Sequence, residues 1–296
     1  MTDPKKRYDF LLLFDVTDGN PNGDPDAGNL PRVDPETMQG IVTDVCLKRK
    51  IRNYVDLKQS PGGPLDLSDE GDGNLFGIFV RDSGVALNTK IEAAVKQANQ
   101  EAKPDKKTTN VKGRAEMCRR YYDVRMFGGV LSTGDYNCGQ VRGPMQLTFS
   151  RSVDPILPAD IAITRVAITK EGEAKETEIG RKAQVPYGLY LGKGFYSPML
   201  AKDTGVTSAD LELFWEAVIG MFENDRSAAR GHMVMREVIV FIHDSPLGNA
   251  PSGRLFGRLK IHRKPGIDAP RSVDDYDIAL DESDLPDGVQ ILRLIE

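Results

Sequence analysis

The sequence predicts an α+β fold with the order β-α-β-β-α-β, the plan of ferredoxin-like and RRM domains, extended by a helical insertion and a protruding hairpin. Tyr8–Val16 is an uninterrupted apolar run that ends in a turn-rich stretch, which indicates a buried strand. Ser208–Asp225 carries apolar residues at i, i+3, i+4 and i+7, which indicates a helix with one buried face. Ile161–Ile168 leads into the charged stretch Lys170–Lys182, an order that is typical of a hairpin whose tip leaves the core.

A loop and a helix are expected after the first strand. Asp18–Arg32 combines Asn-Pro, Asn-Gly and Asp-Pro steps with several glycines, all of which favour tight turns. Asp34 followed by Pro35 has the arrangement of a helix N-cap with proline at the first helical position, so we expect a helix from there to about Val55. At about 100° per residue, three basic residues share one arc of this helix, namely Lys48, Arg49 and Arg52.

The remaining segments complete the plan. Pro61–Gly73 is rich in glycine, proline and aspartate, and Asn88–Arg120 has a helical pattern, so together they predict a separate helical lobe. Two strands joined by a glycine-rich turn are expected next, at Asp123–Leu131 and Gly143–Arg151. Two further strands are expected later in the chain, at Val185–Leu191 and Met233–His243.

Composition and charge predict a globular protein with a segregated surface. The 296 residues are 40% hydrophobic and 28% charged, and no apolar run approaches the roughly 20 residues of a membrane helix, so we expect a cytoplasmic protein without membrane contacts. The net charge of −5 is unevenly spread, because Asp268–Glu296 holds nine acidic and two basic side chains. Lys103–Arg125 holds eight basic and three acidic ones, which suits nucleic acid, with a solvated helix face as the alternative.

Histidine and cysteine chemistry is not expected. The three cysteines, Cys46, Cys118 and Cys138, are far apart and are interpreted as buried thiols. The three histidines are also dispersed, without metal-ligand spacing, at His232, His243 and His262. The sequence contains neither a P-loop nor a nucleophile elbow. We therefore expect no catalytic residue, no metal and no cofactor.

The loop carboxylates offer an alternative, because clustered aspartates bind Mg²⁺ for phosphodiester chemistry. Four such residues are present, Asp18, Asp24, Asp26 and Asp34. Tight turns and helix capping account for them without a metal, since aspartate side chains accept hydrogen bonds from nearby backbone.

Arginines beside flexible backbone are candidates for phosphate contacts, with structural salt bridges as the alternative. Arg142 precedes Gly143, and two more arginines lie in Arg226–Gly231. Lys193–Tyr196 matches the start of the RNA-stacking motif of RRM domains, but the following residues depart from it, so a turn or bulge is the preferred interpretation.

Six motifs together resemble one family. They are DGNPNGDP (18–25), NLPRVD (29–34), TDVCLKRKIR (43–52), DVRMFG (123–128), GQVRGPMQ (139–146) and DRSAARG (225–231). In these motifs the chain resembles the Cas-seven family in its type I-C (Csd-two) branch, the backbone subunit of the CRISPR Cascade surveillance complex. The resemblance runs from about Tyr8 to His262 and is most specific in the loop and the helix that follows it.

The resemblance implies a palm, a finger and a thumb. The palm is RRM-like or ferredoxin-like, the finger is a helical insertion, and the thumb is a protruding hairpin. The expected boundaries are residues 1–57 for the first half of the palm, 58–122 for the finger, 123–153 for palm strands, 154–184 for the thumb, and 185–296 for the second half of the palm and the acidic C-terminal tail.

The resemblance also implies a structural role without enzymatic activity. Several copies polymerise along CRISPR guide RNA, shield its backbone and leave its bases free to pair with target DNA, so that base pairing reads the sequence. The implied partners are the guide RNA, the target DNA strand through the guide, further copies of the chain and other Cascade subunits. Related type III subunits cut RNA with a loop aspartate, but here the nearby Asp34 is expected to act as a cap.

By position, the resemblance implies a set of RNA-binding residues. The loop contributes Asn20, Asn22 and Arg32, and the helix contributes Lys48, Arg49 and Arg52. Weaker candidates are Arg125, Arg142, Arg226 and Arg230. Arg181 and Lys182 are expected at the base of the thumb, near the phosphates.

Two other functions stay open. A guide-processing endoribonuclease of the same superfamily needs a general acid or base near the RNA, typically a histidine, and all three histidines lie late in the chain. A protein-only scaffold would use its basic face for acidic partners, such as the C-terminal tail of a neighbouring copy.

Overall fold

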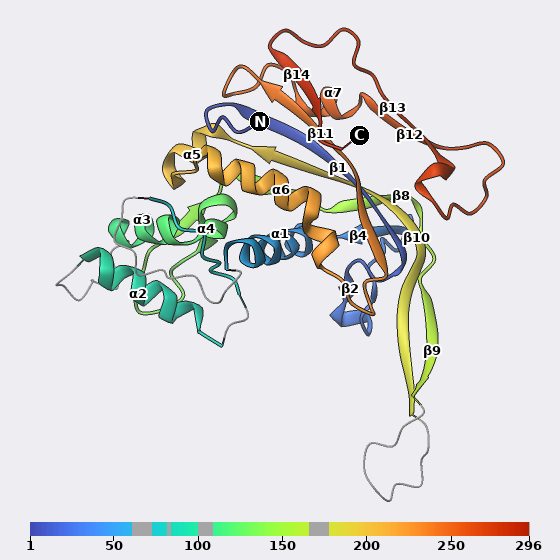
Figure 1. Ribbon diagram of the computed structural model, residues 1–296, viewed down its shortest axis with the longest axis horizontal. Coiled ribbons are helices and arrows are strands. Elements are labelled where there is room, and N and C mark those ends of the chain that lie inside the picture. Colours follow the sequence, from blue (N-terminus) through green and yellow to red (C-terminus); the bar gives the residue numbers. More distant parts are fainter. Residues whose placement is uncertain (61–72, 82–83, 100–108, 166–177, 296) are drawn as a thin grey trace, which may run out of the picture.

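A large antiparallel sheet with helices on one face forms the centre of the molecule (Figure 1). The computed structural model describes residues 1–60, 73–81, 84–99, 109–165 and 178–295. Within them the sheet has eight strands in the order β14-β11-β1-β10-β8-β4, and β7 and β9 also pair with β10. The strands are β1 (Arg7–Gly19), β4 (Gln39–Val42), β7 (Met145–Leu147), β8 (Ser150–Pro155), β9 (Ala159–Arg165), β10 (Glu178–Tyr196), β11 (His232–His243) and β14 (Val289–Arg293). The mixed α+β class predicted from sequence is confirmed.

Strand β1 is apolar throughout because both of its faces are covered. Its even-numbered residues, such as Phe10 and Leu12, face the helices, whereas Leu11 and Leu13 face the C-terminal segment. Successive side chains of a strand point to opposite faces, so an uninterrupted apolar run is expected for a strand buried on both sides. The predicted strand Tyr8–Val16 is confirmed.

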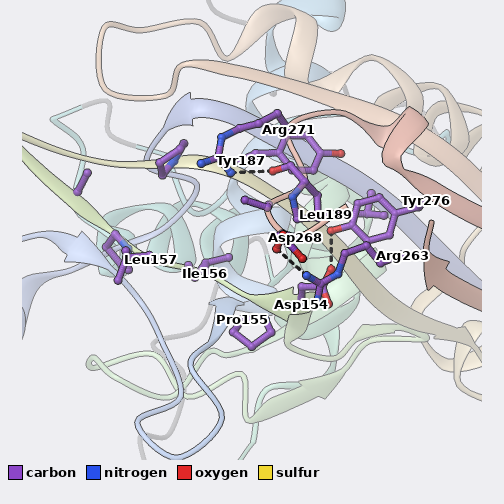
Figure 2. A pocket seen from close by; sticks show the side chains of 16 residues that line it. Asp154, Pro155, Ile156, Leu157, Tyr187, Leu189, Arg263, Asp268, Arg271 and Tyr276 are labelled. Atoms are coloured by element: carbon purple, nitrogen blue, oxygen red, sulfur yellow. Dashed lines mark hydrogen bonds and ion pairs between the residues drawn. The ribbon is translucent and has the colours of Figure 1, made fainter. Parts of the chain in front are cut away.

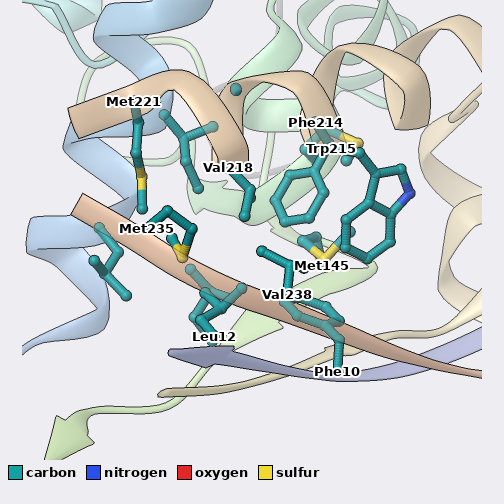
Figure 3. Close-up of a cluster of buried hydrophobic side chains, with 14 of the residues drawn as sticks. Phe10, Leu12, Met145, Phe214, Trp215, Val218, Met221, Met235 and Val238 are labelled. Atoms are coloured by element: carbon teal, nitrogen blue, oxygen red, sulfur yellow. The ribbon is translucent and has the colours of Figure 1, made fainter. Parts of the chain in front are cut away.

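The main core lies between the sheet and two helices, α1 (Asp44–Gln59) and α6 (Ser208–Asn224). Figure 3 shows Phe214 and Val218 of α6 above Phe10 and Leu12 of β1, with Val238 of β11 beside them. Burying side chains of this size contributes roughly 1.5–3 kcal/mol each. The predicted helix at Ser208–Asp225 is confirmed, and Thr207 and Asp210 form a capping box at its start.

The acidic C-terminal segment is part of the fold. Strand β14 pairs with β11 at the edge of the sheet, and the hairpin of β12 (Leu259–Arg263) and β13 (Tyr276–Leu280) covers the face opposite the helices. Helix α7 (Ser252–Phe256) adds Leu255 to the same core. The segment that looks like a charged tail in sequence therefore covers apolar surface of β1.

A helical lobe lies beside the sheet and has its own core (Figure 1). It consists of α2 (Leu87–Asn99), α3 (Val111–Arg120), α4 (Tyr122–Phe127) and the hairpin of β5 (Gly128–Val130) and β6 (Gln140–Arg142). The expected strand at Asp123–Leu131 is wrong in its first half, because residues 122–127 form a helix buried on all sides. A short helix without an exposed face has the same uniform apolar pattern as a buried strand.

The first helix begins nine residues later than expected, with its N-cap at Thr43 instead of Asp34. Asp34 Oδ1 accepts the N–H groups of Glu36 and Thr37 at 3.1 and 3.4 Å, so it caps a turn instead of the helix. Strand β4 follows, and α1 begins at Asp44 with Thr43 as its N-cap. Turns and helix starts use the same side-chain-to-backbone bonds, which is why the two were confused.

A long hairpin leaves the sheet where β10 continues beyond it to pair with β9 (Figure 1). The inner half of β10 is a central strand paired with β1, which confirms the strand predicted at Val185–Leu191. The turn or bulge expected at Lys193–Tyr196 is wrong, because these residues continue the regular pairing with β1 and β7. The charged hairpin tip, the loop after α1 and part of the basic run lie outside the described residues, at 166–177, 61–72 and 100–108.

The expected strand at Met233–His243 is confirmed as β11, and Gly143–Arg151 is divided between β7 and β8. No helix in the described residues is long and apolar enough to cross a membrane.

Candidate nucleic-acid interface

The turn-rich loop folds over the first turn of α1. Asn22 Oδ1 accepts the backbone N–H of Thr43 at 2.9 Å and its hydroxyl at 3.0 Å, which ties the loop to the N-cap of the helix. Asn20 is 4% exposed, and its Nδ2 donates to the carbonyl of Asn29 at 2.7 Å. The short strands β2 (Gly23–Asp24) and β3 (Leu30–Pro31) pair across the loop, with the 3-10 turn Pro25–Ala27 between them. Asn20 therefore stabilises the loop from inside and has almost no exposed surface for a ligand.

A cavity of about 440 Å³ opens between this loop, the N-terminus of α1 and the C-terminus of α6. Its walls carry four cationic side chains and one carboxylate, so the lining has a net positive charge. The lining residues are Asn22, Gly23, Asn29, Arg32, Thr43, Val45, Cys46, Arg49, Lys50, Asp225 and Arg230. The positive end of the α1 dipole lies at the same place, which adds to the attraction for an anion. We call this the α1 cavity.

Three arginines of the α1 cavity keep donors available. Arg49 is exposed and has no hydrogen-bond or ion-pair partner among the described residues. Arg230 Nε lies 3.2 Å from Asp225 Oδ2, while its Nη atoms contact no other described acceptor. Arg32 Nη1 lies 3.3 Å from Asp24 Oδ1, and its Nε is buried without a partner in the described part of the chain, so any donor that Arg32 offers to a ligand lies on its Nη atoms. Guanidinium groups with unused donors match the geometry of phosphate oxygens.

Lys50 is the residue that the sequence interpretation missed. It is 2% exposed at the floor of the cavity, and its ammonium group pairs with Asp225 and lies 5.7 Å from the ring centre of Phe222. Burial lowers the pKa of Lys50, and the neighbouring Asp225 acts in the opposite direction. The sequence did contain a signal for this residue, because Lys50 lies beside Leu47 and Ile51 on the apolar side of α1. A lysine on such a face is rarely buried unless an acidic group pairs with it.

The expected common face of Lys48, Arg49 and Arg52 is divided. Lys48 and Arg52 are 13% and 12% exposed and lie 5.7 and 5.4 Å from the ring centre of Phe127 in the helical lobe. Arg52 Nε also donates to Asp123 Oδ2 at 2.8 Å. These two side chains join α1 to the lobe, and only Arg49 opens onto the α1 cavity.

A second, smaller cavity of about 410 Å³ lies on the lobe side of α1. Its lining includes the ring of Phe127, the backbone of Gly128 and Gly129, and the side chain of Arg142. Arg142 is exposed and has no partner among the described residues. Gly128 has φ of +81°, and a Cβ at this position would lie 2.4 Å from the carbonyl oxygen of Val141, so the backbone here requires glycine.

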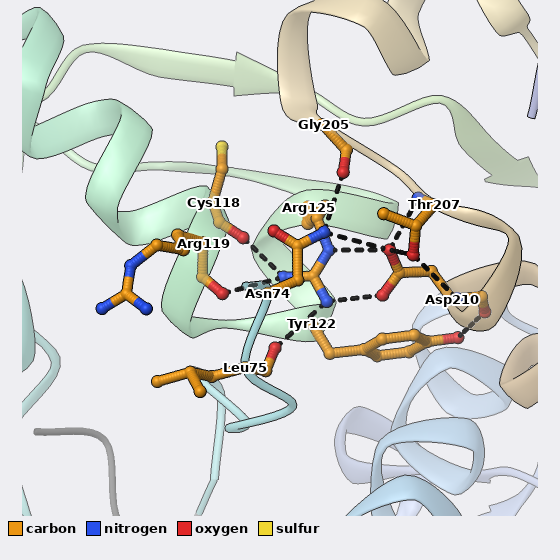
Figure 4. Close-up of polar contacts among 9 residues, drawn as sticks. All are labelled: Asn74, Leu75, Cys118, Arg119, Tyr122, Arg125, Gly205, Thr207 and Asp210. Atoms are coloured by element: carbon orange, nitrogen blue, oxygen red, sulfur yellow. Dashed lines mark hydrogen bonds and ion pairs between the residues drawn. The ribbon is translucent and has the colours of Figure 1, made fainter. Parts of the chain in front are cut away.

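Arg125 is removed from the candidates, because its side chain is fully buried (Figure 4). Nε donates to Asp210 Oδ2 at 3.1 Å, Nη1 donates to the carbonyls of Cys118 and Arg119, and Nη2 donates to Asp210 and to the carbonyl of Leu75. All five donors of the guanidinium group are thus used within the protein. Arg125 therefore forms a buried structural salt bridge with Asp210.

The other predicted residues lie at the surface. Arg226 pairs with Glu223 one turn earlier, at 2.5 Å. Arg181 Nη1 lies 2.7 Å from Asp160 Oδ2 on the hairpin and is 79% exposed, and Lys182 is half-buried beside it. The hairpin residues are on a different element from the α1 cavity (Figure 1).

The three histidines of the chain lie away from the α1 cavity. No histidine is among its lining residues. His243 is buried, with Nε2 3.3 Å from Asp9 Oδ2, while His232 and His262 are exposed elsewhere. In the described part of the chain, no three His, Cys, Asp or Glu side chains are grouped closely enough to hold a metal ion. The hydrogen bond from Arg151, with those from the turn backbone, lowers the pKa of Asp34.

Burial separates the three cysteines. Cys118 and Cys138 are buried, as expected, and burial raises the pKa of each thiol to about 11. Cys46 is only half-buried, because it lines the α1 cavity, where its thiol donates to the carbonyl of Pro21 at 3.4 Å. The expectation of a buried thiol is therefore wrong for Cys46.

A larger cavity of about 670 Å³ lies at the base of the hairpin (Figure 2). Most of its walls are apolar, from Leu157, Leu189 and several prolines. Its main polar groups satisfy one another, because Asp154 accepts from Arg263 Nη2 at 3.2 Å and from the Tyr276 hydroxyl at 2.9 Å. This cavity lacks the concentration of free cations found at the α1 cavity.

An open cavity with surplus guanidinium groups beside a helix N-terminus is the chemistry of a polyanion-binding protein. Comparison with known proteins gives the family of the chain. Residues 6–281 match the family model of CRISPR-associated protein Cas7, so the chain belongs to the Cas7 family. Membership of the Cas-seven family, as the motifs predict, is confirmed.

One curated relative is the CRISPR-associated protein Cas7 of Haloferax volcanii, which is 27% identical over 237 residues, or 72% of this chain. The match spans 64% of the length of that relative. Two solved structures also match over most of the chain. A chain of a "CRISPR RNA-guided surveillance complex, pre-nicking" has a TM-score of 0.47 at 16% identity, with 83% of this chain and 81% of that chain covered. A chain of a "CRISPR RNA-guided surveillance complex" has a TM-score of 0.46 at 14% identity, with coverage of 83% and 73%.

Proposed function

We propose that this chain is a non-enzymatic backbone subunit that binds CRISPR guide RNA, oligomerises along it and presents it for pairing with target DNA. The observation that carries the proposal is the α1 cavity, a net positive site that lies within the region matching the Cas7 family. Its guanidinium groups suit phosphate oxygens, which carry no sequence information, as expected where base pairing supplies specificity.

The finer assignment is a type I-C subunit with a palm, a finger and a thumb. The strand order β11-β1-β10-β7/β8 supports a ferredoxin-like palm, because the first strand lies between the last and the third. The helical lobe corresponds to the finger and the β9–β10 hairpin to the thumb. The proposed partners are the guide RNA, target DNA through the guide, further copies of this chain and other Cascade subunits in the cytoplasm.

The proposed RNA contacts are narrower than the sequence suggested. Arg49 and Arg230 are the principal phosphate ligands, with Arg32, the amide of Asn22 and the exposed Arg142 as further contacts. Lys48 and Arg52 support the helix from the other side, and Asn20 supports the loop. Arg181 and Lys182 serve the thumb.

Co-expression tests the proposal directly. When the chain is produced together with a CRISPR array, we expect RNA of uniform length to copurify. The endoribonuclease alternative predicts cutting of repeat RNA, so the copurified RNA is incubated with and without chelator and its length compared. Protein free of nucleic acid absorbance would contradict the proposal and favour a protein-only scaffold.

The hairpin supplies a second test. A two-stranded ribbon whose faces are exposed contributes little to the stability of the subunit. Replacing residues 170–182 by a short Gly-Ser linker should leave the melting temperature nearly unchanged and reduce the size of the RNA-bound particle. A lower melting temperature with intact particles would show that the hairpin belongs to the core.

A further inference from the structure

We infer that Lys50 is a positioning residue, which holds Asp225 so that Arg230 is free to leave this carboxylate and bind an RNA phosphate. The inference rests on the proposed function. It concerns a residue that itself lies too deep for phosphate contact, at 2% exposure.

The first step is that Asp225 is shared. Its Oδ2 accepts from the buried ammonium group of Lys50 and lies 3.2 Å from Nε of Arg230. Two cations therefore compete for one carboxylate oxygen. Among the described residues that line the α1 cavity, Asp225 is the only acidic one.

The second step is that this carboxylate requires a cation at all times. Asp225 is the C-cap of α6, where the negative end of the helix dipole opposes a second negative charge. The last turn of α6 contains no basic residue of its own. Lys50 from α1 and Arg230 from the following loop provide the compensating charges, and a partly buried carboxylate without either would be strongly unfavourable.

The third step is that the two cations differ in mobility. Lys50 lies at the floor of the α1 cavity, 2% exposed, where its ammonium group is packed against the ring of Phe222 and paired with Asp225. Arg230 is 29% exposed and is followed by Gly231, which has φ of +62° and ends the loop at β11. When a phosphate enters, Arg230 is the partner that turns toward it, and Lys50 is the partner that stays with Asp225.

Loss of Lys50 should therefore trap Arg230. In a Lys50→Met variant the carboxylate keeps only Arg230, so this arginine stays paired and one phosphate contact is lost. RNA affinity should fall roughly tenfold, and the slope of log K against log salt should fall by about one. An Arg230→Gln variant should show the same two changes, and the double variant should lose no more than either single one.

The controls separate positioning from damage to the fold. Lys58 lies on α1 like Lys50 but away from the cavity, and it pairs with Glu216 of α6. Lys58→Met breaks this ion pair and should leave RNA binding unchanged. Asp225→Asn removes the charge that traps Arg230, so Lys50→Met with Asp225→Asn should regain the affinity and slope of the parent. Melting temperatures are recorded for all variants, and binding is measured where each is folded.

A double-mutant cycle of RNA affinities, measured on RNA of one length, tests whether Lys50 acts through Arg230. Non-additive losses for Lys50→Met and Arg230→Gln, with rescue by Asp225→Asn, are the expected result. Additive losses, or no effect of Lys50→Met, would overturn the inference while leaving the proposed function intact. If Arg49→Ala and Arg230→Gln also bind RNA like the parent, the α1 cavity is not the RNA site and the proposed function loses its main support.

Discussion

Each end of α6 carries an ion pair between an aspartate and an arginine, but the two pairs differ in burial and in the number of donors that they use. At the N-terminus, Asp210 caps the helix and receives Arg125, whose five donors are all used inside the protein (Figure 4). At the C-terminus, Asp225 opposes the helix dipole and holds Arg230 by one contact beside an open cavity. A closed network stabilises a fold, whereas unused donors are available to a ligand.

The stability of the protein should depend more on the buried pair at the N-terminus of α6 than on exposed ion pairs. Arg125→Met leaves Asp210 charged and buried without its partner, so the free energy of unfolding should fall by about 3–5 kcal/mol. Urea denaturation measures the loss, and Arg226→Met is the matched control, because an exposed pair contributes about 0–1 kcal/mol. If the Arg125→Met variant kept its stability and lost RNA binding, Arg125 would be a ligand-binding residue and its structural role would be contradicted.

Asp123 is a second buried carboxylate whose hydrogen bonds all lie within the protein. Its carboxylate accepts the N–H groups of Phe79 and Val80 at 2.7 and 3.0 Å as well as Arg52. Asp123→Ala leaves these donors unsatisfied, so we expect a loss of about 2–4 kcal/mol in the free energy of unfolding. Asp123→Asn keeps one acceptor and should lose less. Binding of RNA by the folded fraction should stay at the parental level, and a selective loss of binding would show that Arg52 contacts RNA.

Much of the fold follows from periodicity, but the site does not. Tyr8–Val16 is identified by its uninterrupted apolar run, and Ser208–Asp225 by the helical spacing of its apolar residues. The six-residue helix α4 is too short and too deeply buried to show a period of 3.6, and β4 is only four residues long. Local patterns carry no information about which elements cover a segment in the tertiary structure.

The same limit applies to charged residues. Arg125 and Arg230 both lie beside glycine-containing turns in sequence, yet one is fully buried and the other borders a cavity. Which of them is buried depends on α6, more than eighty residues from Arg125. Lys50 was overlooked because its partner, Asp225, is distant in sequence and adjacent only in the folded chain.

Two buried carboxylates of β1, Asp9 and Asp15, also differ in how well they are paired. Their pKa values shift in opposite directions, so they should affect the pH dependence of stability in opposite ways. Burial acts to raise the pKa of Asp9, but hydrogen bonds from His243 and Arg7 outweigh it and lower that pKa below 3.8. Burial raises the pKa of Asp15 above 3.8, more than Arg236 and Tyr187 lower it, and its Oδ1 has no partner among the described residues.

The sign of each effect follows from linkage. Asp9 contributes stability above pH 3.8 that is lost as the pH falls through its lowered pKa. Asp15 costs stability as the pH rises from 3.8 through its raised pKa. Melting temperatures are recorded across this range. Asp9→Asn should remove the loss of stability below pH 3.8, and Asp15→Asn should remove the loss of stability above pH 3.8. Equal curves for both variants would show that the two sites do not differ.

The central claim is that the α1 cavity binds RNA through phosphates, and the salt dependence of binding tests it most directly. Affinities of the parent and of Arg49→Ala with Arg230→Gln are measured over a series of salt concentrations, on two unrelated RNAs of equal length. We expect the two RNAs to give one line for each protein, and the slope of the variant to be smaller by about two. Equal slopes for parent and variant, or very different affinities for the two RNAs, would contradict the account.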